Sequence, residues 1–472
     1  MNNKALVFVK NFSYSLSANI TALLISTLIV LIVPKLIGVQ DYGYLQLYLF
    51  YASFVGFFQF GWNDGIYLRY GGMAYNTLDK KLLFSQFWML TISQVILAII
   101  LTVASLMFVH DAEKQLILVS VALCMISMGV RAMLLLILQA TNRIKEYALI
   151  TIMEKIIYGG LILVFLIAGV RVYKLLIVAD LIGKFVSFAY ATYYCRDIVF
   201  LKISTFYFSF KEALENISVG INLMFANIAS MLIIGLVRFG IERSWDVSTF
   251  GKVSLTLSVS SLMMLFINAI GIIMFPILRR TDEKKLTSIY VTLRDLLMVL
   301  LLGILMFYYP IKVVLSGWLP KYADSLMYMA LVFPMCVYEG KMALLINTYL
   351  KTLRKERLML IVNLISLALS LIITLVTTLI LKNLNLAIVS IVILLAFKCA
   401  LSEIFISKIL KIPIYKDMVL EFMMTLIFIL TGWFINSWLA VLFYAVGYII
   451  YLLIKRRDIS TSLVNVKVLT KG

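Results

Sequence analysis

Long apolar stretches follow one another along almost the whole chain. Each has about 20 residues, the length that an α-helix needs to cross the hydrocarbon core of a bilayer. With 63% hydrophobic and only 14% charged residues, the chain of 472 residues is too apolar for a soluble protein with one or two cores. We therefore predict an all-α integral membrane protein with about 14 transmembrane helices. The stretches lie near residues 12–33, 44–62, 83–109, 116–139, 148–169, 174–194, 217–237, 251–275, 290–309, 325–349, 358–381, 385–407, 418–435 and 438–454.

Lysine and arginine are unevenly divided between the two sides of the predicted membrane. When the loops are assigned alternately to the two sides, 26 of these residues fall on the side of the N-terminus and 10 on the other. The positive-inside rule then places both termini of this multi-pass protein in the cytoplasm. The formal charge of +19 is thus explained mostly by topology, and no nucleic-acid partner is expected.

Two pairs of segments recur at nearly the same spacing. SMGVRAMLLLILQATNRIKE aligns with VYEGKMALLINTYLKTLRKE, which sets Arg131 opposite Lys341 at an offset of 210 residues. VQDYGYLQLYL, from Val39, aligns with VSTFGKVSLTL, from Val247, at an offset of 208. The repeats predict two six-helix lobes, residues 1–200 and 201–412, related by a parallel pseudo-twofold axis, with substrate bound between them. Residues 413–472 would add two transmembrane helices and a basic cytoplasmic tail.

Arg131 and Lys341 are the most informative polar residues in the apolar stretches. A cation in the hydrocarbon costs roughly 2.5 to 3.5 kcal/mol on insertion scales, so each needs a partner, water or a route to the interface. Their equivalent positions favour a symmetric cavity that binds an anion, and Tyr338 shares the helical face of Lys341. The alternative is that both cations snorkel to the cytoplasmic interface.

Other polar residues complete the candidate site. Asn19 and Asn227 belong to polar stripes on the first helix of each half, which suit a sugar-binding cleft or, alternatively, interhelical hydrogen bonds. Asp180 and Lys184, four residues apart, favour a structural pair. The candidate substrate-binding residues are Arg131, Lys341, Arg69, Lys155, Asn19, Asn227 and Tyr338. The candidates for binding a coupling ion are Glu154, Asp180 and Glu339.

Short motifs accompany this layout. Gly38 precedes Asp41-Tyr42-Gly43, Phe250-Gly251 follows in the second copy, Pro276 ends the span near 251–275, and LSGWLPKYADSLMYM contains Gly317, Tyr322 and Ala323. In these features the chain resembles the polysaccharide or oligosaccharide flippases, of the O-antigen or capsule type, in the multidrug/oligosaccharidyl-lipid/polysaccharide exporter superfamily. One departure is the segment 216–237, which has no acidic residue where family members often carry one.

The resemblance implies a function. Two lobes would alternate access and move a polyprenyl-diphosphate-linked oligosaccharide from the cytoplasmic to the outer leaflet of the bacterial plasma (inner) membrane. The movement would be driven by an ion or by membrane potential and would serve surface polysaccharide assembly. Membrane lipid would surround this substrate, and the partners of the same pathway would be glycosyltransferases and a polysaccharide polymerase.

Other functions would require other residues. An exporter of organic cations or drugs would prefer intramembrane acids, whereas we expect a basic balance among the buried charges. A membrane glycosyltransferase or polymerase would need a sizeable external loop or an acidic catalytic pair, and a non-transporting scaffold would have lost the cavity cations. No GxxxxGK[ST] motif occurs, no cysteine pair has CxxC spacing, and His110 is the only histidine. We therefore expect a transporter rather than an enzyme, without a metal or cofactor.

Overall fold

The computed structural model describes residues 3–279, 283–435 and 437–471, and over these ranges the chain is 88% helical and has no strand. Within the described residues, twelve helical segments are long and apolar enough to cross a membrane. The two other predicted spans fall on α2 (Val39–Ser53) with the 3₁₀ turn η1 (Val55–Gln59), and on α10 (Val247–Arg279), which continues past Pro276. The prediction of an all-α, multi-pass membrane protein is confirmed.

The chain divides into two compact units, Met1–Ile228 and Ala229–Gly472. The division lies inside α9 (Phe210–Ser244), a helix of 35 residues. We call these unit 1 and unit 2.

Unit 1 is organised around α5 (Ala112–Ala140), which packs against α2, α3, α4 and α7. Aspartates cap two of its long helices: the carboxylates of Asp79 and Asp111 accept hydrogen bonds from the first free amides of α4 and α5. The remaining helices pack around this centre. They are α1 (Asn3–Leu36), α3 (Trp62–Tyr70), α4 (Lys80–Phe108), α6 (Ile144–Ile167), α7 (Tyr173–Tyr194), α8 (Arg196–Val199) and the N-terminal half of α9.

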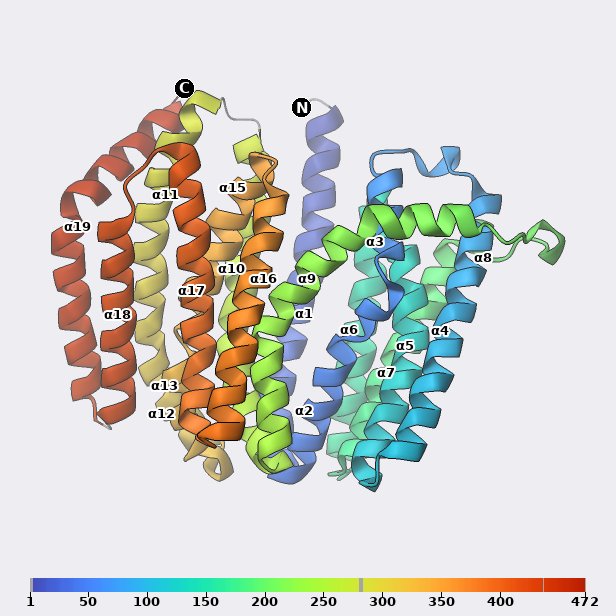
Figure 1. The fold of residues 1–472 in the computed structure, drawn as a ribbon, viewed down its shortest axis with the longest axis horizontal. Coiled ribbons are helices and arrows are strands. Elements are labelled where there is room, and N and C mark those ends of the chain that lie inside the picture. Colours follow the sequence, from blue (N-terminus) through green and yellow to red (C-terminus); the bar gives the residue numbers. More distant parts are fainter. Residues whose placement is uncertain (1–2, 280–282, 436, 472) are drawn as a thin grey trace. The chain divides into compact units, whose positions relative to one another are not determined.

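Unit 2 contains a broken, deeply buried span over Ser325–Thr352. Pro334 separates α13 (Tyr328–Val332) from α14 (Met335–Lys341), and a π-helical turn, Met342–Ile346, joins α14 to α15 (Asn347–Thr352). π-Turns inside α-helices are frequent at functional sites, and this one begins directly after Lys341. The other helices are α11 (Glu283–Ile304), α12 (Tyr308–Trp318), α16 (Glu356–Thr374), α17 (Leu384–Leu410), α18 (Tyr415–Phe434) and α19 (Leu439–Lys471). Of these, α11, α18 and α19 run side by side (Figure 1).

A close backbone contact fixes α3 against the N-terminal half of α9 in unit 1. A Cβ atom on Gly65 would lie 1.8 Å from the carbonyl oxygen of Asn216, and one on Gly220 would lie 2.0 Å from that of Gly61. Arg69 strengthens the same contact, because its guanidinium donates to Asn216 at 2.7 Å and to Glu212 at 2.9 Å. Glycine is therefore required at both positions of the contact.

Replacing Gly65 with leucine is expected to separate α3 from α9 and to lower the free energy of unfolding by at least about 1 to 3 kcal/mol, the usual cost of overpacking. Gly160→Leu is the matched control, because a Cβ atom there meets no heavy atom within 4 Å. Thermal unfolding of the two purified variants in detergent measures the difference. Equal midpoints for the two variants would contradict the contact.

Candidate functional site: buried charged centres in each unit

Arg131 joins three helices of unit 1. Its Nη1 donates to the carboxylate of Glu154 on α6 and, at 2.8 Å, to the hydroxyl of Ser187 on α7. The same hydroxyl donates to the carbonyl oxygen of Ile150 at 3.1 Å, which ties α7 to α6. Arg131 and Glu154 are both buried, so the cation is satisfied by an acidic partner and does not reach the interface by snorkelling.

Lys341 is the corresponding cation of unit 2 and is fully buried, with 0% exposure. Its ammonium donates to Glu403 on α17 at 2.6 Å, and to the two carboxylate oxygens of Glu421 on α18 at 2.8 and 2.7 Å. One turn earlier on α14, the hydroxyl of Tyr338 is 2.8 Å from that of Thr425 on α18. We call Lys341, Glu403 and Glu421 the triad.

Among the described residues, six cations and five carboxylates are buried, so the expected basic excess amounts to one charge. One cation faces two carboxylates in the triad, and Glu154 stands between Arg131 and Lys155, with 3.7 Å to the latter. The sequence does not identify Glu403 and Glu421 as partners of Lys341, because they lie 62 and 80 residues beyond it. Helical spacing reveals only partners three or four residues apart.

Asp180 and Lys184 form the ion pair that their spacing predicts. The ammonium of Lys184 donates to Asp180, which also accepts a hydrogen bond of 2.7 Å from the hydroxyl of Tyr48 on α2. All three side chains are buried. The cluster therefore joins α2 to α7 and gives Asp180 a structural role in the described state.

The remaining predicted residues differ in how much of each side chain is exposed. Asn19 and Asn227 are exposed, Lys155 is about one-third exposed, and Glu339 is half-buried. Arg69 is held by α9, as described above. In unit 1 the structure thus brings Arg131, Lys155 and Glu154 together, and in unit 2 it brings Tyr338 next to the triad.

Lys398, near Glu339, has a hydrogen-bond partner on another helix of unit 2. Its ammonium donates to the hydroxyl of Ser230 on α9 at 2.7 Å, and it interacts electrostatically with Glu339 of α14. Lys398 thus donates to α9, whereas Glu403, five residues further along α17, accepts from Lys341 of α14.

A second charged network lies between α11, α18 and α19. The ammonium of Lys455 is 2.9 Å from Asp295 and 2.6 Å from Asp417, and the guanidinium of Arg294 pairs with Asp417. These residues line a polar pocket of about 710 Å³ together with Asp458, Ser462 and Asn465. Arg294 is only 4% exposed and belongs to this network.

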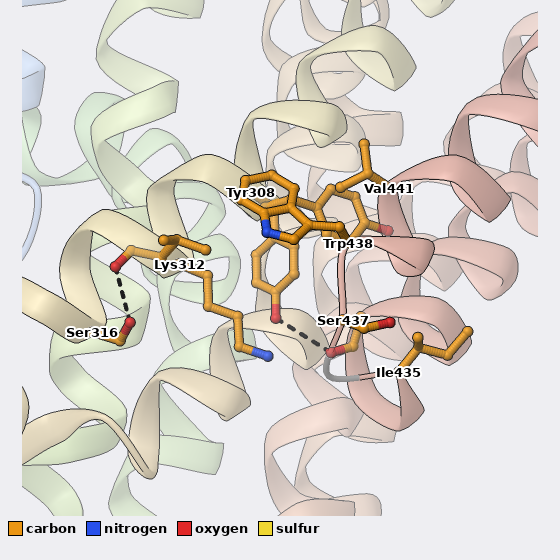
Figure 2. Close-up of a pocket in the computed structure, with 10 residues that line it drawn as sticks. Tyr308, Lys312, Ser316, Ile435, Ser437, Trp438 and Val441 are labelled. Carbon is orange, nitrogen blue, oxygen red and sulfur yellow. Dashed lines mark hydrogen bonds between the residues drawn. The ribbon is translucent and has the colours of Figure 1, made fainter.

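A smaller pocket of about 160 Å³ lies between α12 and the connection of α18 to α19. Figure 2 shows Tyr308, Trp438 and Lys312 converging on it. The ammonium of Lys312 is 5.8 Å from the centre of the Tyr308 ring, and the Tyr308 hydroxyl donates to the carbonyl oxygen of Gly432 at 3.4 Å. Aromatic residues beside a cation are typical of the interfacial ends of membrane helices.

Comparison with known proteins places the fold. No protein-family model matches the chain, and no curated protein matches its sequence. Among solved structures, an inward-facing multidrug resistance MATE transporter of the MOP superfamily matches with a TM-score of 0.61 and 12% identity, over 82% of this chain and 96% of that one. The lipid II flippase MurJ, in an inward closed conformation, matches with a TM-score of 0.65 and 14% identity, over 94% of this chain and 99% of that one.

The chain therefore has the fold of the MOP-superfamily transporters. Within that fold, the match to MurJ extends over more of the chain than the match to the MATE transporter. Because residues 413–472 make up more than a tenth of the chain, a match that covers 94% of it must reach into the two C-terminal helices.

Proposed function

We propose that the chain is a flippase that moves a polyprenyl-diphosphate-linked oligosaccharide from the cytoplasmic to the outer leaflet of a bacterial inner membrane, for surface polysaccharide assembly. The observation that carries this proposal is the match to a lipid II flippase, because it extends into the two C-terminal helices. A flippase substrate with a lipid tail needs a membrane-embedded carrier, and the twelve described spans supply one.

The contacts of α18 support this proposal. α18 contributes Glu421 to the ammonium of Lys341, the cation that the sequence repeat sets opposite Arg131. The first of the two C-terminal helices is therefore bonded to the centre of unit 2, and an exchange of partners by Lys341 would move α18 relative to α14 and α17. This connection favours a transporter in which the C-terminal helices take part in the conformational cycle.

The buried cations are proposed to meet the diphosphate only when their present carboxylate partners are displaced. Lys155 is one-third exposed beside the Arg131–Glu154 pair, so it would provide the first contact for an anionic headgroup. A diphosphate could then replace Glu154 on the guanidinium, because arginine binds phosphate and carboxylate with the same planar fork. Exposed Asn19 and Asn227 would exchange hydrogen bonds with sugar hydroxyls, and Arg69 and Tyr338 would join after their present bonds to α9 and α18 open.

The experiment is translocation in proteoliposomes. Purified protein is reconstituted with a polyprenyl-diphosphate oligosaccharide that carries a fluorophore, and a membrane-impermeant quencher reports which leaflet holds the label. We expect the protein to make the inner-leaflet label accessible to the quencher, whereas protein-free liposomes keep that label protected, because a charged headgroup does not readily cross the hydrocarbon core. Protection unchanged by the protein would contradict the flippase proposal.

Export of an organic cation is the second candidate, and one observation favours it: the triad holds more carboxylates than cations. Carboxylates in a membrane cavity attract cations. The same vesicles loaded with ethidium decide between the two candidates. Ethidium movement without movement of the labelled lipid would assign the chain to cation export.

A further inference from the structure

The charges of the triad do not balance. Lys341 contributes one positive charge and Glu403 and Glu421 contribute two negative charges, in a site where the three side chains are 0%, 1% and 4% exposed. An uncompensated charge at such depth is expensive, and a buried ionisable group commonly becomes neutral instead. The triad therefore has a physical reason to take up one proton.

The hydrogen bonds locate the oxygen without a partner. Both oxygens of Glu421 and the Oε2 atom of Glu403 accept from Lys341, whereas the Oε1 atom of Glu403 is buried and has no hydrogen-bond partner. The hydroxyl of Tyr290 on α11 is also buried without a partner, and Tyr290 interacts electrostatically with Glu403. A bare carboxylate oxygen would be costly here, whereas a protonated one can donate a hydrogen bond.

We propose that the triad is a proton-binding site that holds one dissociable proton between Glu403 and Glu421, and that this proton couples transport to the proton gradient. The coupling part rests on the proposed flippase function. The sequence candidates for a coupling ion were Glu154, Asp180 and Glu339, and two of these already have strong cationic partners. The proton belongs to the pair of carboxylates rather than to one of them, because they share the same ammonium.

Several titratable or charged groups among the described residues face the triad. The neighbouring groups are Tyr290 and Arg294 of α11, Tyr338 of α14, Cys399 of α17, Asp417 of α18 and Tyr451 of α19. Asp417 is neutralised by Arg294 and Lys455. Arg294 carries a positive charge toward the triad, but it is shared with Asp417, so the triad keeps its need for a proton.

The proposed route of this proton to the triad passes through the polar pocket of about 710 Å³. Asp417 lines the pocket and lies four residues, about one helical turn, before Glu421 on α18. Lys455 lines it as well, four residues after Tyr451 on α19. Arg294 connects the pocket to the triad, because it pairs with Asp417 and interacts electrostatically with both Glu403 and Glu421. A movement of α18 by one helical turn would bring the triad to the pocket.

Infrared spectroscopy of the full-length protein in lipid tests the site without any transport substrate. The C=O stretching band of a protonated carboxylic acid, identified by its shift in D₂O, is expected at neutral pH in the wild type. Both Glu403→Gln and Glu421→Gln should remove it, because each leaves one carboxylate balanced by Lys341. Glu212→Gln, at the partly exposed partner of Arg69, is the control and should keep the band.

Several results would overturn the proton site. They are a folded wild type without the band at neutral pH, a band that persists in both glutamine variants, and a band that sodium ions remove at constant pH. Elution as a single species in size-exclusion chromatography verifies folding, and the two variants are independent, so one that fails to fold leaves the other. A band in a protein that moves no labelled lipid would support the proton site while the flippase proposal fails.

The coupling role is measured separately in the labelled-lipid vesicles. Translocation by the wild type is expected to change rate when a pH gradient is imposed, and translocation by Glu403→Gln is expected to be independent of the gradient. Wild-type translocation that ignores the gradient would overturn the coupling role.

Discussion

Lys341→Met is expected to lower the free energy of unfolding by about 3 to 5 kcal/mol, the usual cost of removing one partner of a buried ion pair. The ammonium is fully buried and makes all three of its hydrogen bonds to Glu403 and Glu421. Without it, the negative charge that Glu403 and Glu421 share stays buried with no cation bonded to it. Chemical or thermal unfolding of the purified protein in lipid or detergent measures the loss.

A compensating variant separates charge from packing in this prediction. Lys341→Met combined with Glu403→Gln and Glu421→Gln leaves a neutral site of similar volume, and it should regain most of the lost stability, because neutral replacements of buried ion pairs are often tolerated. Lys155→Met is the control, since that lysine is one-third exposed and its nearest acid is 3.7 Å away. If Lys341→Met unfolds no earlier than Lys155→Met, the buried triad is not what stabilises unit 2.

The sequence predicts the helices well because the bilayer imposes one simple requirement on them. A span must be apolar and about 20 residues long, and these properties are local. The break in the span Ser325–Thr352 is different. Pro334 indicates a break, but no local pattern predicts the π-turn from Met342 to Ile346, which begins directly after Lys341.

The candidate site could be predicted only in part. The internal repeat identifies Arg131 and Lys341, and the spacing of Asp180 and Lys184 predicts their pair, because these signals are either repeated or local. The acidic partners Glu403 and Glu421 lie on other helices, and no pattern along the chain indicates that they contact Lys341. A cation in an apolar stretch predicts that it has a partner, but the sequence alone does not identify that partner.

The two repeats keep the cation but not its partner. In unit 1 the acid comes from α6, the next helix along the chain, whereas in unit 2 it comes from α17 and α18. The helix α16, which follows Lys341 as α6 follows Arg131, gives Lys341 no acid among the ion pairs of the described residues. A cation preserved while its carboxylates change is consistent with a role of the cation beyond pairing.

Arg131→Gln is expected to reduce translocation of the labelled lipid by about tenfold or more, the value of one charge-assisted hydrogen bond to a phosphate. It should also destabilise the protein, because Glu154 and Ser187 lose the guanidinium that joins α5 to α6 and α7. The rate of quencher accessibility in proteoliposomes and the unfolding midpoint are measured on the same preparation, at equal amounts of folded protein.

The double variant Arg131→Gln with Glu154→Gln distinguishes a structural role of Arg131 from substrate binding. Removing both charges leaves no buried carboxylate unpaired, so the unfolding midpoint should return toward that of the wild type. Translocation should stay low, because a glutamine cannot replace the guanidinium on a diphosphate. Recovery of both stability and translocation would show that Arg131 only joins helices, and the headgroup site would then have to be sought at Lys155 and the exposed polar residues.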